Sequence, residues 1–291
     1  MISITGRDDL HKVVVLNPKG GCGKTTLATN LASYYALRGP PPTLIDCDPQ
    51  GYCLGWLEKR PEHHAPIHGL RGYQESSATR EPVHLEVEPD STIAIIDLPA
   101  AIPYERLHAY THIGDSLLLP IQPSSVDVYS ATRFVAELLL DAQLDRSERR
   151  LAIVANRVRS KTRSYRMLVR FLTSLRIPMI AALRDSQNYV HAADLGLGIC
   201  ELPRHRIKDD LPQISAIVSW LDKRRTITAA QRQAMIAKAA YRCAERRGFE
   251  GGDPILDWLE AERDVDASLG RVNVNIRSIE GDDIHGGKGE Q

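Results

Sequence analysis

The 291-residue chain has few of the features that mark secreted, membrane-spanning or zinc-bound proteins. Its five cysteines are scattered and form no C-x-x-C pair, which indicates reduced thiols rather than disulfides or a zinc site. No apolar run approaches the roughly 18 residues that cross a bilayer. The first dozen residues carry acids where a signal peptide needs an apolar stretch. We therefore expect a cytoplasmic protein.

Net charge is also lacking, because 37 Lys and Arg residues balance 37 Asp and Glu residues. Whole-chain charge thus indicates no particular partner, and any basic surface must be local. With 43% apolar and 25% charged residues, the composition argues against global disorder. The length suits one α/β domain of about 200–250 residues with a smaller appendage.

Short, continuously apolar runs alternate with helical patterns through the first two-thirds of the chain. Strands without polar alternation are typical of a sheet covered on both faces, so we expect a doubly wound, mostly parallel α/β sheet. The predicted strands are 12–17, 43–46, 93–97, 116–120, 151–156 and 178–183, and the predicted helices are 25–37, 126–142 and 163–175. Ligands of such sheets bind at the carboxyl ends of the strands, so the residues there are the candidates for function.

The rest of the chain has a different character. Residues 58–91 are polar, with weak periodicity, and are predicted to be a long surface insertion. Helical patterns over 228–247 and, after an Asp-Pro start signal, 254–269 predict a hairpin. We expect a nucleotide-binding domain over 1–225, a helical hairpin domain over 226–270 and a flexible tail over 271–291.

A glycine-rich segment follows the first predicted strand and opens a helix. Glycines let backbone amides turn around phosphate oxygens, and the helix N-terminus adds partial positive charge. Lys24 is expected to bridge the β- and γ-phosphates, and the Thr25 hydroxyl to ligate Mg²⁺. The predicted nucleotide-binding residues of this segment are Lys19, Gly20, Gly21, Cys22, Gly23, Lys24, Thr25 and Thr26.

The segment departs from the common P-loop pattern in two ways. Pro18 stands where the first glycine is expected, and Lys19 is an additional lysine. This K-G-G-x-G-K-T form resembles the deviant Walker A motif of the ParA/MinD family of P-loop ATPases. The resemblance implies ATP and Mg²⁺ as cofactors. It also implies an ATP-bound homodimer in which Lys19 reaches the other subunit's phosphates, so that Lys19 and Lys24 are both catalytic.

Two strand ends carry aspartates that agree with this family. The segment 46–51 looks like the family's D-x-D-P-Q sequence, whose second Asp organises the attacking water. The resemblance therefore implies that Asp48 is catalytic and that Asp46 gives support near the metal. Asp97 closes an apolar strand as a Walker B aspartate does. The implied magnesium site comprises Thr25, Asp48 and Asp97. The segment after Asp97 departs from the more usual D-x-P-P.

Two further strand ends match segments that contact the adenine base in the family. Asn156 closes the fifth predicted strand and matches the adenine-contacting Asn. Arg184 follows the sixth strand in a second base-contacting segment, although a surface ion pair with Asp185 explains it equally well. The resemblance covers about residues 10–225. Residues 228–269 instead resemble a small bacterial helical domain of unknown function (the DUF2934 type), which carries no chemistry.

A local excess of positive charge lies between Arg149 and Arg176, where nine basic residues occur and no acidic one. Several recur three or four positions apart, so one helix face can carry them and neutralise DNA phosphates without reading bases. The family's nucleoid binding favours the same interpretation. The alternative is a solvated face that pairs with acids elsewhere. The predicted DNA-binding residues are Arg157, Arg159, Lys161, Arg163, Arg166 and Arg170.

The resemblance implies an ATP-driven positioning switch associated with the nucleoid. ATP joins two subunits, the dimer binds DNA non-specifically, and a cargo-bound ParB-like or adaptor protein stimulates hydrolysis. The cargo is a plasmid, a chromosome region, a chemoreceptor cluster or a carboxysome, with a slight preference for a protein assembly.

Three other functions remain as alternatives. A MinD-like membrane-surface ATPase needs a basic amphipathic helix at the C-terminus, but the last residues are polar and glycine-rich, so no membrane partner is expected. A cluster-carrying enzyme is disfavoured because no cysteine occurs between Cys53 and Cys200. A small-molecule ligase of the same fold needs a substrate pocket that the sequence does not identify.

Overall fold

The computed structural model describes residues 2–73, 83–102, 104–140, 150–175, 177–224, 229–246 and 253–270. They belong to two compact units, Met1–Thr226 and Ile227–Gln291, which we describe separately. The predicted tail over 271–291 lies outside the described residues. In the described ranges, every helix is too short or too polar to span a bilayer.

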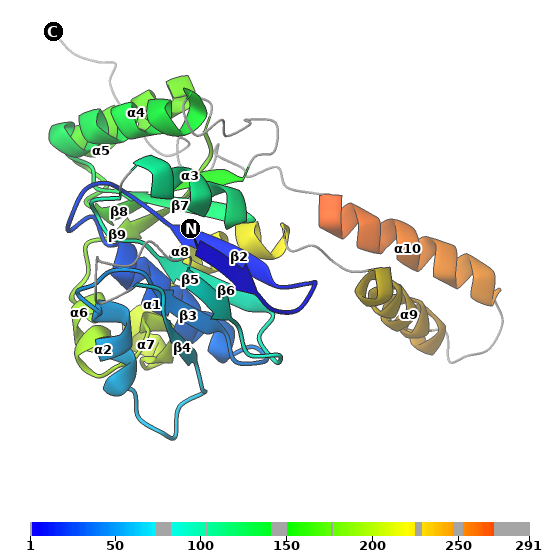
Figure 1. The fold of residues 1–291 in the computed structure, drawn as a ribbon. Coiled ribbons are helices and arrows are strands. Elements are labelled where there is room, and N and C mark those ends of the chain that lie inside the picture. The colour runs from blue at the N-terminus through cyan, green and yellow to red at the C-terminus, as the bar shows by residue number, and fades with distance from the viewer. Residues whose placement is uncertain are drawn as a thin grey trace, which may run out of the picture. The chain divides into compact units, whose positions relative to one another are not determined.

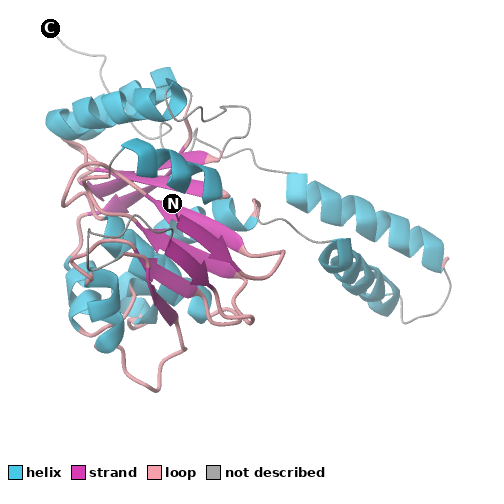
Figure 2. Cartoon of the chain, in the orientation of Figure 1, coloured by secondary structure: helices cyan, strands magenta, loops and turns pink. Residues whose placement is uncertain are grey.

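A seven-stranded sheet forms the centre of the first unit, in the order β4-β3-β6-β2-β7-β8-β9 (Figure 2). Every strand pair in it is parallel. The strands are β2 (His11–Val15), β3 (Thr43–Asp46), β4 (His68–Arg71), β6 (Ile93–Asp97), β7 (Ser116–Ile121), β8 (Leu151–Val158) and β9 (Met179–Arg184). All six predicted strands are present, two with the predicted ends and four with ends shifted by at most two residues, which confirms the α/β class.

Helices cover both faces of this sheet, which explains why its inner strands are largely apolar (Figure 1). One face packs against α1, α2, α6 and α8, and the other against α3, α4 and α5. These helices, with the short α7 and the 3₁₀ turn η2, are α1 (Lys24–Ala36), α2 (Tyr52–Glu58), α3 (Tyr104–Ile113), α4 (Ser125–Leu140), α5 (Arg163–Leu175), α6 (Gln187–Asp194), η2 (Ile199–Glu201), α7 (Arg204–Ile207) and α8 (Leu211–Asp222).

The prediction of a surface insertion over 58–91 is wrong in part. Within it, β4 adds an edge strand beside β3. A second strand, β5 (Val83–Glu86), pairs in parallel with β1 (Ile2–Thr5) as a separate two-stranded sheet. Both β4 and β5 have four residues and leave alternate positions exposed. Such short, half-exposed strands lack the continuous apolar pattern from which the other strands were predicted.

The described part of the second unit contains two helices. Helices α9 (Ala229–Arg246) and α10 (Pro254–Gly270) pack on each other. Their small core contains Ile236 and Ala261, with Ala239, Ala240 and Trp258 partly buried against it. The side chain of Asp253 accepts a hydrogen bond from the Ile255 amide (2.9 Å), which is the N-cap that the Asp-Pro sequence predicted.

Candidate nucleotide-binding site

The glycine-rich loop lies between β2, near the middle of the sheet, and α1. Gly21 and Gly23 have φ angles of 73° and 98°, which L-residues with side chains rarely adopt. A side-chain carbon at Gly20 or Gly21 would meet no atom within 4 Å, so open space adjoins the loop. At Gly23 the same carbon would lie 2.0 Å from Nδ2 of Asn156, so only glycine fits. The loop is therefore open to a ligand and closely supported from β8.

The Thr25 hydroxyl donates a hydrogen bond to Oδ2 of Asp97 (2.7 Å), which joins the start of α1 to the end of β6. Asp97 is only 1% exposed, and its Oδ1 has no hydrogen-bond partner among the described residues. Burial raises the pKa of Asp97 to about 6, although hydrogen bonds from Thr25 and Cys53 oppose that shift. A buried carboxylate with an unused oxygen beside a hydroxyl fits Mg²⁺, which prefers oxygen ligands.

The two aspartates after β3 have different environments. Asp46 is fully buried, and its carboxylate accepts hydrogen bonds from the amides of Asp48, Cys53 and Leu54 at 3.0, 2.9 and 3.2 Å. Burial raises the pKa of Asp46. Its oxygens thus fix the loop that leads into α2, and its support near the metal stays a prediction. Asp48 is half-buried and accepts the Gln50 amide at 3.0 Å.

These elements meet around a pocket of about 510 Å³, a size typical of small-molecule sites. Three segments come from strand ends: the glycine-rich loop, the loop after β3 and the loop after β6. The lining residues are Gly20, Gly21, Gly23, Lys24, Thr25, Thr26, Asp48, Gln50, Tyr52, Pro99, Ala100, Ala101 and Arg157. The structure therefore brings the predicted phosphate loop and Asp48 to one cavity. Arg157, which was predicted to bind DNA, also lines it.

Lys19 makes a contact that the sequence did not predict. Its Nζ lies 2.6 Å from Oδ1 of Asp127, in the first turn of α4. Nζ of Lys24 donates to the Lys19 carbonyl at 3.2 Å, and Nε2 of Gln122 donates to the Gly21 carbonyl at 2.7 Å. The N-terminal end of α4 therefore adjoins the glycine-rich loop. The sequence signal for Asp127 is an ordinary helix start, with Ser124 three residues earlier.

The two predicted base-contacting residues are both engaged within the protein. Nδ2 of Asn156 donates to the Cys22 carbonyl at 2.7 Å, so Asn156 supports the glycine-rich loop directly. Nε and an Nη of Arg184 donate to Asp210 at 2.5 and 2.9 Å. That pair ties β9 to the start of α8, and Asp185 instead pairs with Arg159 at 2.8 Å. Contact of Asn156 and Arg184 with adenine stays a prediction.

The predicted basic face lies largely on α5. Tyr165, Leu168 and Leu172 pack into the core from one side of this helix. Arg163, Arg166 and Arg170 are exposed and form no ion pair with any described residue, and Lys161 is exposed just before the helix. Arg159 is exposed but paired with Asp185. Arg157 lies outside this face, in β8.

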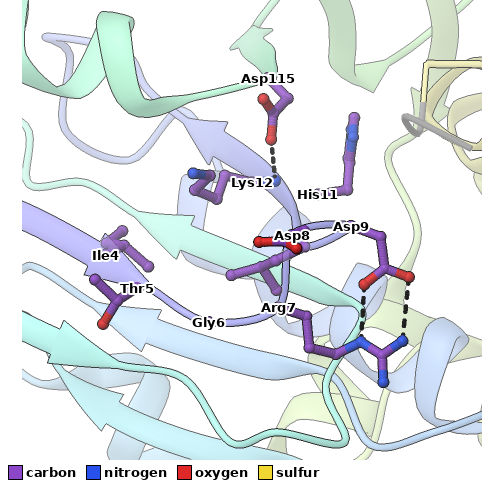
Figure 3. A pocket seen from close by; sticks show the side chains of 10 residues that line it. Ile4, Thr5, Gly6, Arg7, Asp8, Asp9, His11, Lys12 and Asp115 are labelled. Atoms are coloured by element: carbon purple, nitrogen blue, oxygen red, sulfur yellow. Dashed lines mark hydrogen bonds and ion pairs between the residues drawn. The ribbon is translucent and has the colours of Figure 1, made fainter. Parts of the chain in front are cut away.

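A second pocket, of about 320 Å³, lies at the amino end of β2, opposite the phosphate loop (Figure 3). Three of its charged side chains have partners within the chain. Arg7 forms an ion pair with Asp9 at 2.8 Å, and Oδ2 of Asp115 accepts the Lys12 amide at 2.7 Å. This pocket contains none of the predicted site residues.

A glycine-rich loop between a central parallel strand and a helix, with a threonine bonded to the aspartate of the neighbouring strand, defines a P-loop nucleotide-binding protein. The family described as the CobQ/CobB/MinD/ParA nucleotide binding domain matches residues 13–199. The chain belongs to this family. Residues 231–267 match DUF2934, a protein family of unknown function.

Curated relatives of the chain act in partition and distribution, as their names state. It is 25% identical over 194 residues to maintenance of carboxysome distribution protein A of Halothiobacillus neapolitanus, covering 65% of this chain and 87% of the relative. It is 35% identical over 124 residues to the chromosome-partitioning ATPase Soj of Thermus thermophilus. That match covers 41% of this chain and 49% of Soj, so it spans about half of that relative.

Solved structures share the fold at low sequence identity. The septum site-determining protein MinD of Pyrococcus horikoshii, complexed with Mg-ADP, has a TM-score of 0.51 and 15% identity, covering 76% of this chain and 99% of MinD. A McdA variant of Cyanothece in complex with ATP has a TM-score of 0.51 and 16% identity, covering 73% and 98%. At these identities the likeness shows the fold alone.

Proposed function

We propose that this protein is a Mg²⁺-dependent ATPase that dimerises on ATP, binds DNA without sequence preference and positions a cargo. The observation that carries the proposal is the meeting, around one pocket, of the phosphate loop, the Thr25–Asp97 pair and Asp48. The names of its relatives connect this family with chromosome partition and carboxysome distribution.

The phosphate loop and a few residues near the pocket have proposed roles in binding or hydrolysis. The loop amides and Lys24 hold the β- and γ-phosphates, because they supply donors and positive charge where phosphate oxygens lie. Thr25 and Asp97 hold the metal ion, which neutralises phosphate charge when bound. The half-buried Asp48 orients the attacking water from the loop that follows β3. Asp46 fixes that loop by accepting the Asp48 amide. Lys19 completes the charge stabilisation of the partner subunit's nucleotide.

The exposed face of α5, formed by Arg163, Arg166 and Arg170, is proposed to bind the phosphates of DNA. Its arginines are exposed and unpaired with any described residue, so they contact phosphates without first breaking an ion pair. The apolar side of the helix is buried in the core, which holds those side chains on a rigid element. This surface would associate the dimer with the nucleoid in the cytoplasm.

A protein assembly is the proposed cargo, and a cargo-bound ParB-like or adaptor protein is the proposed stimulator of hydrolysis. The support for a protein cargo is the match to carboxysome distribution protein A, which extends over 87% of that relative. Soj is named as a chromosome-partitioning ATPase, and a chromosome or a plasmid as cargo remains an outcome of a localisation test.

The decisive experiment uses the purified full chain with Mg²⁺ and either ATP or ADP. Light scattering after gel filtration reports the oligomeric state, and sedimentation with unrelated DNA fragments reports binding. We expect a dimer and DNA retention with ATP only. A monomer under all conditions would contradict the proposal. Anionic vesicles in a parallel tube test the MinD-like alternative, which predicts ATP-dependent lipid binding instead.

A further inference from the structure

Arg157 has an unusual backbone conformation close to the nucleotide pocket. Its φ angle is +51°, and among the described residues it is the only non-glycine residue with a positive value. The β8–β9 pairing is interrupted at the same place, between Ala155 and Val158. Residues held in such sparsely populated conformations cluster at functional sites, because the surrounding structure must enforce them.

The enforcement comes from Asn156 and the phosphate loop. The Arg157 amide donates to Oδ1 of Asn156 at 3.0 Å, while Nδ2 of Asn156 donates to the Cys22 carbonyl at 2.7 Å. Gly23 offers no side chain against that amide group, so Asn156 packs closely on the loop. Through Asn156, the phosphate loop thus fixes the backbone of β8 at Arg157.

Arg157 lines the same pocket as the phosphate loop and Asp48. It is exposed, and its guanidinium has no hydrogen bond or ion pair with any described residue. Nearby arginines differ in this respect, since Arg159 pairs with Asp185 and Arg184 with Asp210. Among the residues that line the pocket, Lys24 is the other cation.

We propose that Arg157 is a nucleotide-binding residue whose guanidinium pairs with the phosphates of the bound nucleotide. This inference rests on the nucleotide site of the proposed function and assigns it one more cation. Nucleoside di- and triphosphates carry several negative charges, and a planar guanidinium with five donors suits phosphate oxygens. An unpaired arginine in a strained turn is already positioned for that contact before the ligand enters.

The test measures binding of fluorescent ATP and ADP analogues, with Mg²⁺, to Arg157→Gln, Arg157→Gly and Arg157→Lys. Glycine accepts a positive φ without strain, so Arg157→Gly removes the guanidinium without disturbing the turn. We expect the Gln and Gly variants to bind roughly tenfold more weakly or worse, and Lys to fall between them and the wild type. The matched control is Arg133→Gln, since Arg133 is exposed on α4 and its one ion pair among the described residues is with Glu137.

Each contrary outcome identifies what fails. Affinity equal to the wild type in the Gln and Gly variants would overturn the role of Arg157 while leaving the nucleotide site intact. Weaker nucleotide binding by Arg157→Gln but not by Arg157→Gly would assign the effect to the backbone. That result would also overturn the proposed role of Arg157. At saturating ATP the variants should retain DNA. Weaker DNA retention with normal nucleotide affinity would instead show that Arg157 binds DNA, as the sequence predicted. No binding by the wild type would overturn both proposals.

Discussion

Lys19 and Asp127 form an ion pair in which Nζ lies 2.6 Å from Oδ1. The Asp127 side chain is 5% exposed, whereas that of Lys19 is 34% exposed. The lysine that is proposed to serve the partner subunit is therefore held by a buried carboxylate of its own subunit. Dimerisation must break this contact, so the pair should oppose the ATP-bound dimer.

Replacing the carboxylate tests this relationship. Asp127→Asn keeps the shape of the side chain but removes its charge, so Lys19 is held less strongly. We expect the dimer to form at an ATP concentration several-fold lower than in the wild type, as measured by light scattering during an ATP titration. Glu137→Gln, also on α4, is the matched control. An unchanged or higher ATP requirement would show that the pair does not restrain Lys19.

Lys19→Gln should bind nucleotide yet stay monomeric.

Asp48→Ala should separate binding from hydrolysis. Removing the carboxylate that orients water leaves the phosphate loop and the Thr25–Asp97 pair intact. We expect an ATP-bound dimer that persists and a phosphate-release rate at least about 100-fold lower, in line with losing a general base. Gln50→Ala, in the same loop, controls for loop disturbance. Turnover at the wild-type rate would remove Asp48 from catalysis.

Charge reversal on α5 should weaken DNA binding selectively. Arg163→Glu combined with Arg166→Glu changes two exposed side chains and leaves the apolar core unaltered. We expect the slope of log affinity against log salt to fall by about 0.9 for each DNA phosphate that is no longer neutralised, with nucleotide affinity unchanged. Filter binding at several salt concentrations measures this. Arg133→Glu on α4 provides the control, and equal DNA retention in both proteins would exclude the α5 face.

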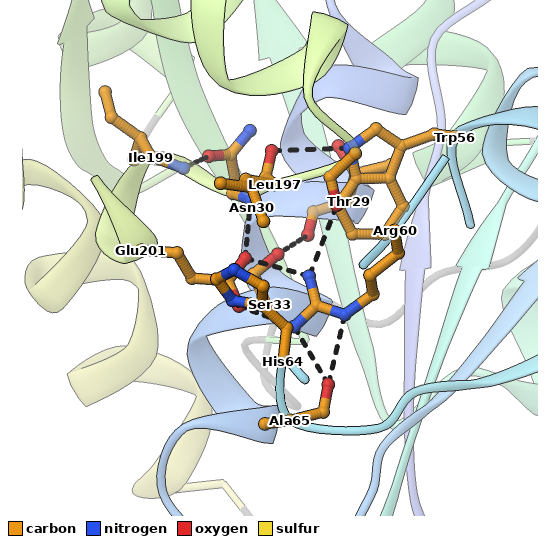
Figure 4. A network of polar contacts seen from close by, with 12 residues as sticks. Thr29, Asn30, Ser33, Trp56, Arg60, His64, Ala65, Leu197, Ile199 and Glu201 are labelled. Carbon is orange, nitrogen blue, oxygen red and sulfur yellow. Dashed lines mark hydrogen bonds and ion pairs between the residues drawn. The ribbon is translucent and has the colours of Figure 1, made fainter. Parts of the chain in front are cut away.

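The buried pair Arg60–Glu201 should make stability dependent on acid pH (Figure 4). Burial alone raises the pKa of Glu201, but hydrogen bonds from Arg60 and the Gly198 amide, with the charges of Arg60 and His64, lower it overall. The folded state therefore favours the carboxylate. Its stabilisation is present above the ordinary pKa of 4.5 and is lost as the pH falls through the lower, folded value.

Glu201→Gln leaves Arg60 buried without its counter-charge, so we expect a loss of about 3 kcal/mol in the free energy of unfolding at pH 7. Thermal melts followed by circular dichroism should show that the wild type loses stability more steeply than the variant below pH 4.5. Parallel curves for the two proteins would show that Glu201 does not contribute to the acid sensitivity.

The core strands and the phosphate loop were predictable because their signals are local. A continuous apolar run and a fixed order of glycines and lysines depend on neighbouring residues alone. Strands β4 and β5 were not predicted because they lie at edges and leave alternate side chains exposed. An edge strand has little need of the apolar pattern that marks a buried one.

The contacts that refine the site depend on residues far apart in the chain. The partner of Lys19 is a carboxylate on α4, and Asp127 has no sequence signal beyond that of an ordinary helix start. The conformation of Arg157 follows from the contact of Asn156 with the phosphate loop, and no propensity of Arg157 itself predicts it. The three backbone amides that donate to the fully buried Asp46 likewise follow from the folded loop after β3 and have no signal in the sequence.

The close fit of Gly23 against Asn156 has a practical consequence for protein engineering. A graft that moves only residues 18–26 into another scaffold leaves the loop without the amide that supports it from β8. The smallest transferable unit is the loop together with the end of that strand, although the two are distant in the sequence. Recombination between relatives should then succeed more often when both segments come from the same parent.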